Sequence, residues 1–163
     1  MEQTEDPMNE REFSNRVRSM RDRLWRVSFS IVRSAADAED AMQEALLRAW
    51  RNVDSLRDKS LFETWLTRIL INECRRLIRK KPDTAEIPES LPAPKAENPG
   101  LGRVIGSLKM DLRLPVILYY IEGYSVKETA GIMRITQSSV KSRLMRARKK
   151  LEEALKKEAA QDE

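Results

Sequence analysis

The sequence contains no histidine and a single cysteine, Cys74. A lone cysteine excludes an internal disulfide and is compatible with a reducing compartment. With no imidazole and one thiol, the chain lacks the usual ligands of a structural zinc site. No phosphate loop and no nucleophile–base pair stand out either. We therefore expect no metal site, no cofactor and no enzymatic activity.

Long apolar runs are also missing. No stretch approaches the roughly 20 apolar residues of a membrane-spanning helix. The charged N-terminus does not contain the apolar core of a signal peptide. These absences predict a cytoplasmic protein. Glycine (5) and proline (7) are scarce among the 163 residues, and 35% of the residues are charged. That composition favours helices.

The net charge of +5 is unevenly distributed along the chain. Arg75–Lys81 and the C-terminal region hold much of the basic excess, whereas Asp37–Glu44 is acidic. Such patches predict a polyanion as partner for some faces and a different partner for others.

Apolar residues at helical spacing predict three helices in the first half of the chain. The expected helices run from Asn9 to about Ser34, from there to Trp50, and from Ser60 to about Lys80. Asn52–Lys59 reads as a loop. Ser60 and Glu63 have the spacing of a capping box, and Pro82 disfavours a longer third helix. Phe62 and Trp65 lie on the apolar stripe and are expected in the core.

Residues 82–102 include five prolines and two glycines, which is typical of an extended, semi-rigid linker. The sequence therefore predicts an all-α protein of two small helical domains joined by a Pro-rich linker. The expected division is a flexible tail at 1–8, a first domain at 9–82, the linker at 83–102, a second domain at 103–157 and a tail at 158–163.

The second half begins with a short helix that is expected at 101–108. Pro115 is tolerated only in the first turn of a helix, so the next helix should start near Arg113 or Leu114. Gly123 ends it. Ser125 and Glu128 form another capping-box spacing before a short helix to about Met133, and Thr136 caps the last helix.

That last helix is apolar on one face and basic on the other, with no acid between Glu128 and Glu152. A short helix, a tight turn and a longer basic helix predict a helix-turn-helix, whose second helix enters the major groove of DNA. The stripe Val140, Leu144, Ala147 and Leu151 would be buried. The candidate DNA-binding residues are Gln137, Ser138, Lys141, Ser142, Met145, Arg146, Arg148 and Lys149.

Taken alone, this half would also suit a response regulator or a repressor. The first half carries a more specific resemblance. Ser34–Trp50 (SAADAEDAMQEALLRAW) resembles region 2.2, and the segment leading to it, of bacterial sigma factors of the extracytoplasmic-function (ECF) group. Phe62–Arg79 (FETWLTRILINECRRLIR) resembles regions 2.3 and 2.4. Leu108–Leu155, which includes SVKSRLMRAR, resembles region 4.

The resemblance implies a sigma factor that binds core RNA polymerase, directs it to promoters and helps to melt DNA. It implies that the last helix contacts the −35 element of promoter DNA, and that a sequestering anti-sigma factor, often membrane-bound, is a further partner. Lys141 and Met145 depart from the residues common at their positions. The implied polymerase contacts are Asp40, Gln43, Glu44 and Arg48. The implied −10 contacts are Asn72, Arg75, Arg76 and Arg79.

Two other interpretations remain open at this point. A helix-turn-helix repressor or activator whose N-terminal helices dimerise would bind a palindromic site without polymerase. An anti-sigma factor or adaptor would bind polymerase but not DNA, and the acid-free basic helix argues against it.

Overall fold

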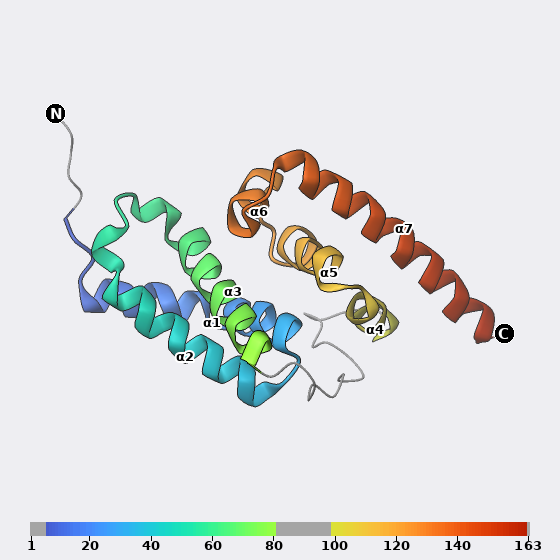
Figure 1. The fold of residues 1–163 in the computed structure, drawn as a ribbon, viewed down its shortest axis with the longest axis horizontal. Helices are drawn as coiled ribbons and strands as arrows, with labels where there is room; N and C mark the ends of the chain where they lie inside the picture. Colours follow the sequence, from blue (N-terminus) through green and yellow to red (C-terminus); the bar gives the residue numbers. More distant parts are fainter. Residues whose placement is uncertain (1–5, 81–98, 163) are drawn as a thin grey trace.

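The computed structural model describes residues 6–80 and 99–162 (Figure 1). Within them every element of regular structure is helical, which confirms the predicted all-α class. Most of the predicted linker lies outside the described residues. The first body contains α1 (Glu10–Val32), α2 (Ala35–Arg51), the 3-10 turns η1 (Val53–Ser55) and η2 (Lys59–Leu61), and α3 (Phe62–Lys80). The second contains α4 (Pro99–Ser107), α5 (Met110–Val116), the π-helical turn η3 (Ile117–Ile121), α6 (Val126–Met133) and α7 (Gln137–Gln161).

The first two helices begin and end close to the predicted residues because their caps are local. The side chain of Asn9 accepts from the backbone N–H of Glu12, and that of Ser34 accepts from Asp37. Each bond satisfies a donor that the first turn leaves without a partner. Arg33 ends α1 in the left-handed region at φ 55°. The chain then reverses directly into α2.

The predicted capping box at Ser60 and Glu63 is wrong. Asp58 is the cap, because its carboxylate accepts from the backbone N–H of Ser60 at 3.0 Å and from the hydroxyl at 2.6 Å. Lys59–Leu61 forms a 3-10 turn, and α3 starts only at Phe62. Glu63 is thereby free to pair with Arg23 at 2.8 Å.

The predicted start of the next helix, near Arg113, is also wrong. Helix α5 begins at Met110 and places Pro115 in its interior. Proline has no N–H, so the carbonyl four residues earlier, on Asp111, loses its helical donor. Arg143 of α7 reaches that carbonyl at 3.5 Å. The next turn widens into η3, in which Glu122 N–H donates to the carbonyl of Ile117. Gly123 ends this segment at φ 77°, as predicted.

Three boundaries of the expected division differ from the described structure. Met8, placed in the N-terminal tail, is buried. Helix α4 begins at Pro99, inside the expected linker, and α7 continues to Gln161, inside the expected C-terminal tail.

The core of the first body is formed by the inner faces of α1, α2 and α3. Phe62 is buried and contacts Phe13 edge-on, with ring centroids 5.7 Å apart; half-buried Trp65 packs against it. The alanines of α2 that face this core let α3 approach closely; they are Ala38, Ala41, Ala45 and Ala49. In the second body, α5, α6 and α7 enclose Leu118, Val140 and Leu144.

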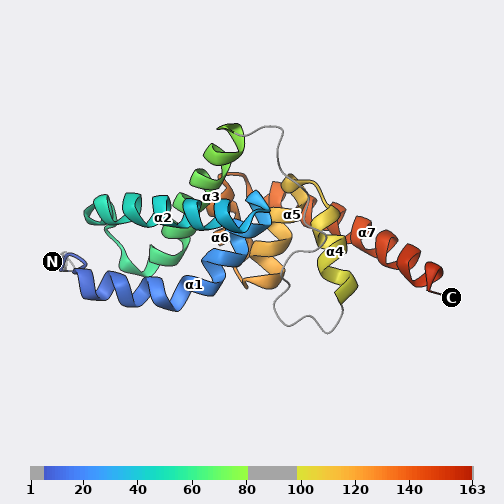
Figure 2. The same cartoon turned by 90° about the horizontal axis from the view of Figure 1, so that it is seen from below.

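The two bodies pack against each other along α1 and α3 on one side and α5, η3 and α6 on the other (Figure 2). The side chain of Glu122 is 1% exposed and lies between two arginines of α1. Arg26 donates to its two oxygens at 2.6 and 3.0 Å, and Arg23 donates at 3.3 Å. The hydroxyls of Tyr124 and Thr67 lie 3.0 Å apart beside them. The hydrogen bond with Glu122 raises the pKa of Arg26.

At the other end of this contact, arginines meet the C-termini of helices. Arg113 donates to the carbonyl of Ser30 at 2.9 Å and to that of Leu108 at 2.8 Å, and Arg33 donates to Gly106. Cations suit helix C-termini, where carbonyls lack partners and the macrodipole is negative. Burial lowers the pKa of Arg113 to about 10, with a further contribution from nearby Arg33.

The single thiol gives a first prediction. Cys74 is fully buried, and burial raises its pKa to about 12. At pH 8 the folded protein should therefore leave an aromatic disulfide reagent almost unreacted, and denaturant should release one reactive thiol per chain. Rapid reaction of the folded protein would contradict the buried position. Because the unfolded thiol has a pKa of about 8.5, the free energy of unfolding should fall as pH rises above about 9.

A second prediction concerns the contact between the bodies. Glu122→Gln should lower the free energy of unfolding by about 1.5–3 kcal/mol, because it removes charge-assisted hydrogen bonds to a buried group. Glu63→Gln is the matched control: it pairs with the same Arg23 but is 56% exposed, so its loss should cost less than about 1 kcal/mol. Urea unfolding of both variants measures the difference. Equal losses in the free energy of unfolding would show that the burial of Glu122 adds nothing to the stability that its ion pairs provide.

Candidate nucleic-acid and partner interfaces

Helices α6 and α7 form the helix-turn-helix that the sequence predicts. Ser125 accepts from the N–H of Glu128 at 3.0 Å and caps α6. Arg134 then takes the left-handed conformation at φ 57°, and Ile135 donates back to the carbonyl of Ala130. Thr136 accepts from the N–H of Ser139 at 3.1 Å and opens α7. The turn is therefore three residues long.

The buried stripe of α7 fixes which side chains face outward. Val140, Leu144 and Ala147 are buried against α5 and α6. All eight candidate DNA-binding residues of this helix are exposed, and Met145 is among the most exposed large apolar residues, at 62%. Arg143, which was not a candidate, points back toward Asp111. The outward face can thus enter a groove without any rearrangement of the core.

The predicted −10 residues lie on the second half of α3. Asn72, Arg76 and Arg79 are exposed, and Arg75 is half-buried. The same helix binds the second body through its first half: Arg68 donates to the carbonyl of Gly131 at 2.7 Å. Helix α3 is therefore divided along its length between a contact within the chain and a basic, outward-facing end.

The predicted polymerase contacts lie together on the outer face of α2. Asp40, Gln43, Glu44 and Arg48 are exposed because the alanines of this helix face the core. Leu47 and Trp50 extend the same helix surface with apolar groups that are 51% and 41% exposed. Exposed large apolar side chains beside charged ones are typical of protein-binding surfaces.

Glu73 is a residue of this region that the sequence did not single out. It is 5% exposed, and its carboxylate lies between Arg48 of α2 at 2.8 Å and Arg76 of α3 at 3.6 Å. It lines a hollow of about 310 Å³ between these helices, together with Asp40, Gln43 and Glu44. The sequence did contain a sign that Glu73 is unusual, since it is the one acid between Glu63 and Asp83 in a basic stretch.

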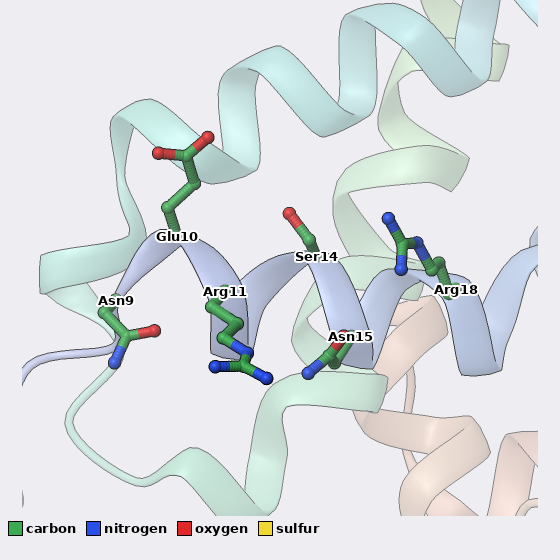
Figure 3. A pocket seen from close by; sticks show the side chains of 6 residues that line it. All are labelled: Asn9, Glu10, Arg11, Ser14, Asn15 and Arg18. Carbon is green, nitrogen blue, oxygen red and sulfur yellow. The ribbon is translucent and has the colours of Figure 1, made fainter.

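A further hollow lies on the outer face of α1 (Figure 3). All of its walls come from consecutive turns of one helix. Binding sites normally have polar groups that converge from more than one element, so this hollow is not a candidate site. Within residues 6–80 and 99–162, no cluster of three or more possible ligands could hold a metal, and no helix combines the length and hydropathy needed to cross a bilayer. The residues that line the hollow are Asn9, Glu10, Arg11, Ser14, Asn15 and Arg18.

Comparison with known families and proteins agrees with this arrangement. Residues 16–83 match the family described as Sigma-70 region 2, and residues 100–151 match Sigma-70, region 4. The first match covers α2 and α3, and the second covers the helix-turn-helix.

Two curated relatives are similar over most of the chain. ECF RNA polymerase sigma factor SigM of Mycobacterium tuberculosis is 30% identical over 135 residues, which span 78% of this chain and 69% of the relative. ECF RNA polymerase sigma-E factor of Escherichia coli is 30% identical over 140 residues, which span 72% of this chain and 73% of the relative.

Two solved structures share the fold. The sigma factor RpoE of Bartonella quintana, in complex with the anti-sigma factor NepR, has a TM-score of 0.75 and 27% identity over 90% of this chain and 98% of its own. CnrH, in complex with the cytosolic domain of CnrY, has a TM-score of 0.71 and 26% identity over 91% of this chain and 90% of its own. With both family matches in the same order along one helical chain, this protein belongs to the ECF sigma factors of the sigma-70 family.

Proposed function

We propose that this ECF sigma factor binds core RNA polymerase through α2, contacts the −35 element through α7, and contacts and helps to melt the −10 element through the basic end of α3. The observation that carries the proposal is the separation of three outward faces on one chain. Each face is held by a buried stripe, and the two basic faces differ in charge from the face on α2. The faces on α3 and α7 suit polyanions, and the acidic and apolar face on α2 suits a protein.

The face on α7 supports sequence-specific contact rather than phosphate contact alone. Its first turns present amide, hydroxyl and thioether groups beside Lys141 and Arg146, and these groups hydrogen-bond or pack against base edges. The cations that follow, Arg148 and Lys149, suit phosphates, which position a protein without reading sequence. This order along the helix matches the usual docking of a helix-turn-helix.

The face on α3 has the groups that strand separation needs. Arginines neutralise the phosphates of a separated strand, and the amide of Asn72 can hydrogen-bond to an unstacked base. Each DNA-binding face lies on a single helix. Two weak sites on one chain gain effective concentration once both are held on the same polymerase. Specific binding should therefore depend on the polymerase.

An anti-sigma factor is the further partner that we propose. Two relatives of known structure are in complex with NepR and with the cytosolic domain of CnrY. Their similarity to this chain extends over both bodies, so a similar partner has a comparable surface here. Such a partner, anchored in a membrane, would hold the factor at the cytoplasmic face until it is released.

Run-off transcription with purified core polymerase tests the main proposal. Adding the protein should produce specific transcripts from its native promoter set, and core alone should produce none. Tight binding to a palindromic site without polymerase would instead support a free-standing repressor or activator. Failure to stimulate initiation on any candidate promoter would rule out the proposed function.

Arg146→Ala should weaken promoter recognition. Loss of one side-chain contact to a base edge costs about 1–3 kcal/mol of discrimination. We expect holoenzyme binding to a −35-containing promoter to fall accordingly, with affinity for core polymerase unchanged. Lys157→Ala, an exposed cation later on the same helix, serves as the control. Equal loss of both activities would indicate misfolding.

Glu44→Lys should show the opposite pattern. Reversal of a charge in a complementary interface costs several kcal/mol, so affinity for core should fall at least about tenfold. Binding of the free factor to −35 DNA should not fall. Fluorescence anisotropy measures the two affinities separately, with labelled factor titrated with core and labelled DNA titrated with factor. An unchanged affinity for core would show that Glu44 does not contact polymerase.

A further inference from the structure

The buried acid Glu73 stands between the two surfaces that the proposed function assigns to different partners. Its Oε1 lies 2.8 Å from Nε of Arg48, on the polymerase-binding helix, and its Oε2 lies 3.6 Å from Nη1 of Arg76, at the DNA-binding end of α3. We propose that Glu73 is a positioning residue that both arginines share, so that occupancy of one binding surface changes the affinity of the other.

Burial makes the carboxylate dependent on both cations. The Glu73 side chain is 6% exposed, whereas those of Arg48 and Arg76 are 54% and 46% exposed. A buried charge is costly unless it is paired, so the carboxylate must keep at least one guanidinium. The arginines are under no such constraint, because water can solvate both. The acid is therefore the fixed member of the triad, and the arginines are the adjustable ones.

The geometry leaves each arginine able to bind a second group. Arg48 meets Glu73 through Nε, and Arg76 meets it through one Nη at a longer distance. A guanidinium has five N–H donors, so both side chains retain donors for an outside acceptor. Glu73 thus holds each arginine near its surface without saturating it. Arg48 remains available to an acidic group of polymerase, and Arg76 to a DNA phosphate.

Sharing one carboxylate couples the two surfaces. If Arg48 is removed, Glu73 pairs with Arg76 alone, and Arg76 becomes less available to phosphate. If Arg76 is removed, Glu73 pairs with Arg48 alone, and Arg48 becomes less available to polymerase. Each arginine should therefore affect the function on the far side of Glu73. Independent surfaces would show no such crossed effects.

The inference rests on the proposed function, and the experiment separates the two. Affinity for core polymerase is measured without DNA. The rate of promoter melting is measured with holoenzyme preassembled at saturating factor, using a fluorescent base analogue in the −10 element. If the wild-type protein neither binds core nor supports melting, the proposed function fails. The inference is judged on a wild-type protein that does both.

Arg48→Ala should slow melting by preassembled holoenzyme about threefold, and Arg76→Ala should weaken core binding by a similar factor, the size expected for partly exposed ion pairs. In a Glu73→Gln background both crossed effects should disappear. In a Glu12→Gln background both crossed effects should persist. Glu12→Gln is the matched control because Glu12 also bridges two cations, Arg16 and Lys59, away from both surfaces.

Thermal unfolding of each variant checks that the fold is retained. The Arg48 and Arg76 variants alone decide the outcome if Glu73→Gln does not fold. Absence of crossed effects in these two variants, or crossed effects that persist in a folded Glu73→Gln protein, would overturn the shared role of Glu73. If Glu73 had only a structural role, Glu73→Gln would lower the stability of the fold, and the Arg48 and Arg76 variants would show no crossed effects.

Discussion

The burial of one carboxylate, Glu122, between Arg23 and Arg26 constrains the arrangement of the whole described chain. A buried carboxylate must be compensated, and the compensation comes from the other body. Arg23 and Arg26 are themselves held in place because the opposite face of α1 is packed against α2 and α3. The ion pair therefore requires both cores to be formed and in contact. Tyr124 and Thr67 add a neutral hydrogen bond beside it.

Arginines have two different roles in this protein, and their surroundings separate them. Arg23, Arg26, Arg33 and Arg113 are directed at carboxylates or helix carbonyls between the bodies. Their fixed, planar arrays of donors suit this role, which a lysine would fill less well. On the outer faces of α3 and α7, Arg79, Arg146 and Arg148 are exposed and can reach a partner. The sequence shows one basic helix after another, and only the packing reveals which cations are already engaged.

Features set by local chemistry were predictable from the sequence. The starts of α1 and α2 near Asn9 and Ser34, the caps at Ser125 and Thr136, the turn before α7 and the buried stripe of α7 depend on residues close together in the chain. The DNA-binding candidates on α7 are exposed as expected for the same reason. Features set by distant partners were not predictable. Pro115 is accommodated inside a helix because Arg143 and a widened turn serve the freed backbone, and Glu73 is buried because Arg48 comes from another helix. Local spacing also misplaced the start of the third helix, since Ser60 and Asp58 are both capable acceptors, and Asp58 caps the turn η2 that precedes α3.

The π-helical turn η3 sets the rotational phase of everything that follows it. In an α-helix each residue advances the direction of its side chain by about 100°. The wider turn takes up extra residues while Leu118 stays in the core of the second body, and so it determines the direction in which Glu122 leaves the helix. A one-residue deletion between 117 and 121 would leave every charged residue in place, yet it would turn Glu122 away from α1. Insertions and deletions here should therefore be far less tolerated than substitutions, a constraint on length rather than on chemistry.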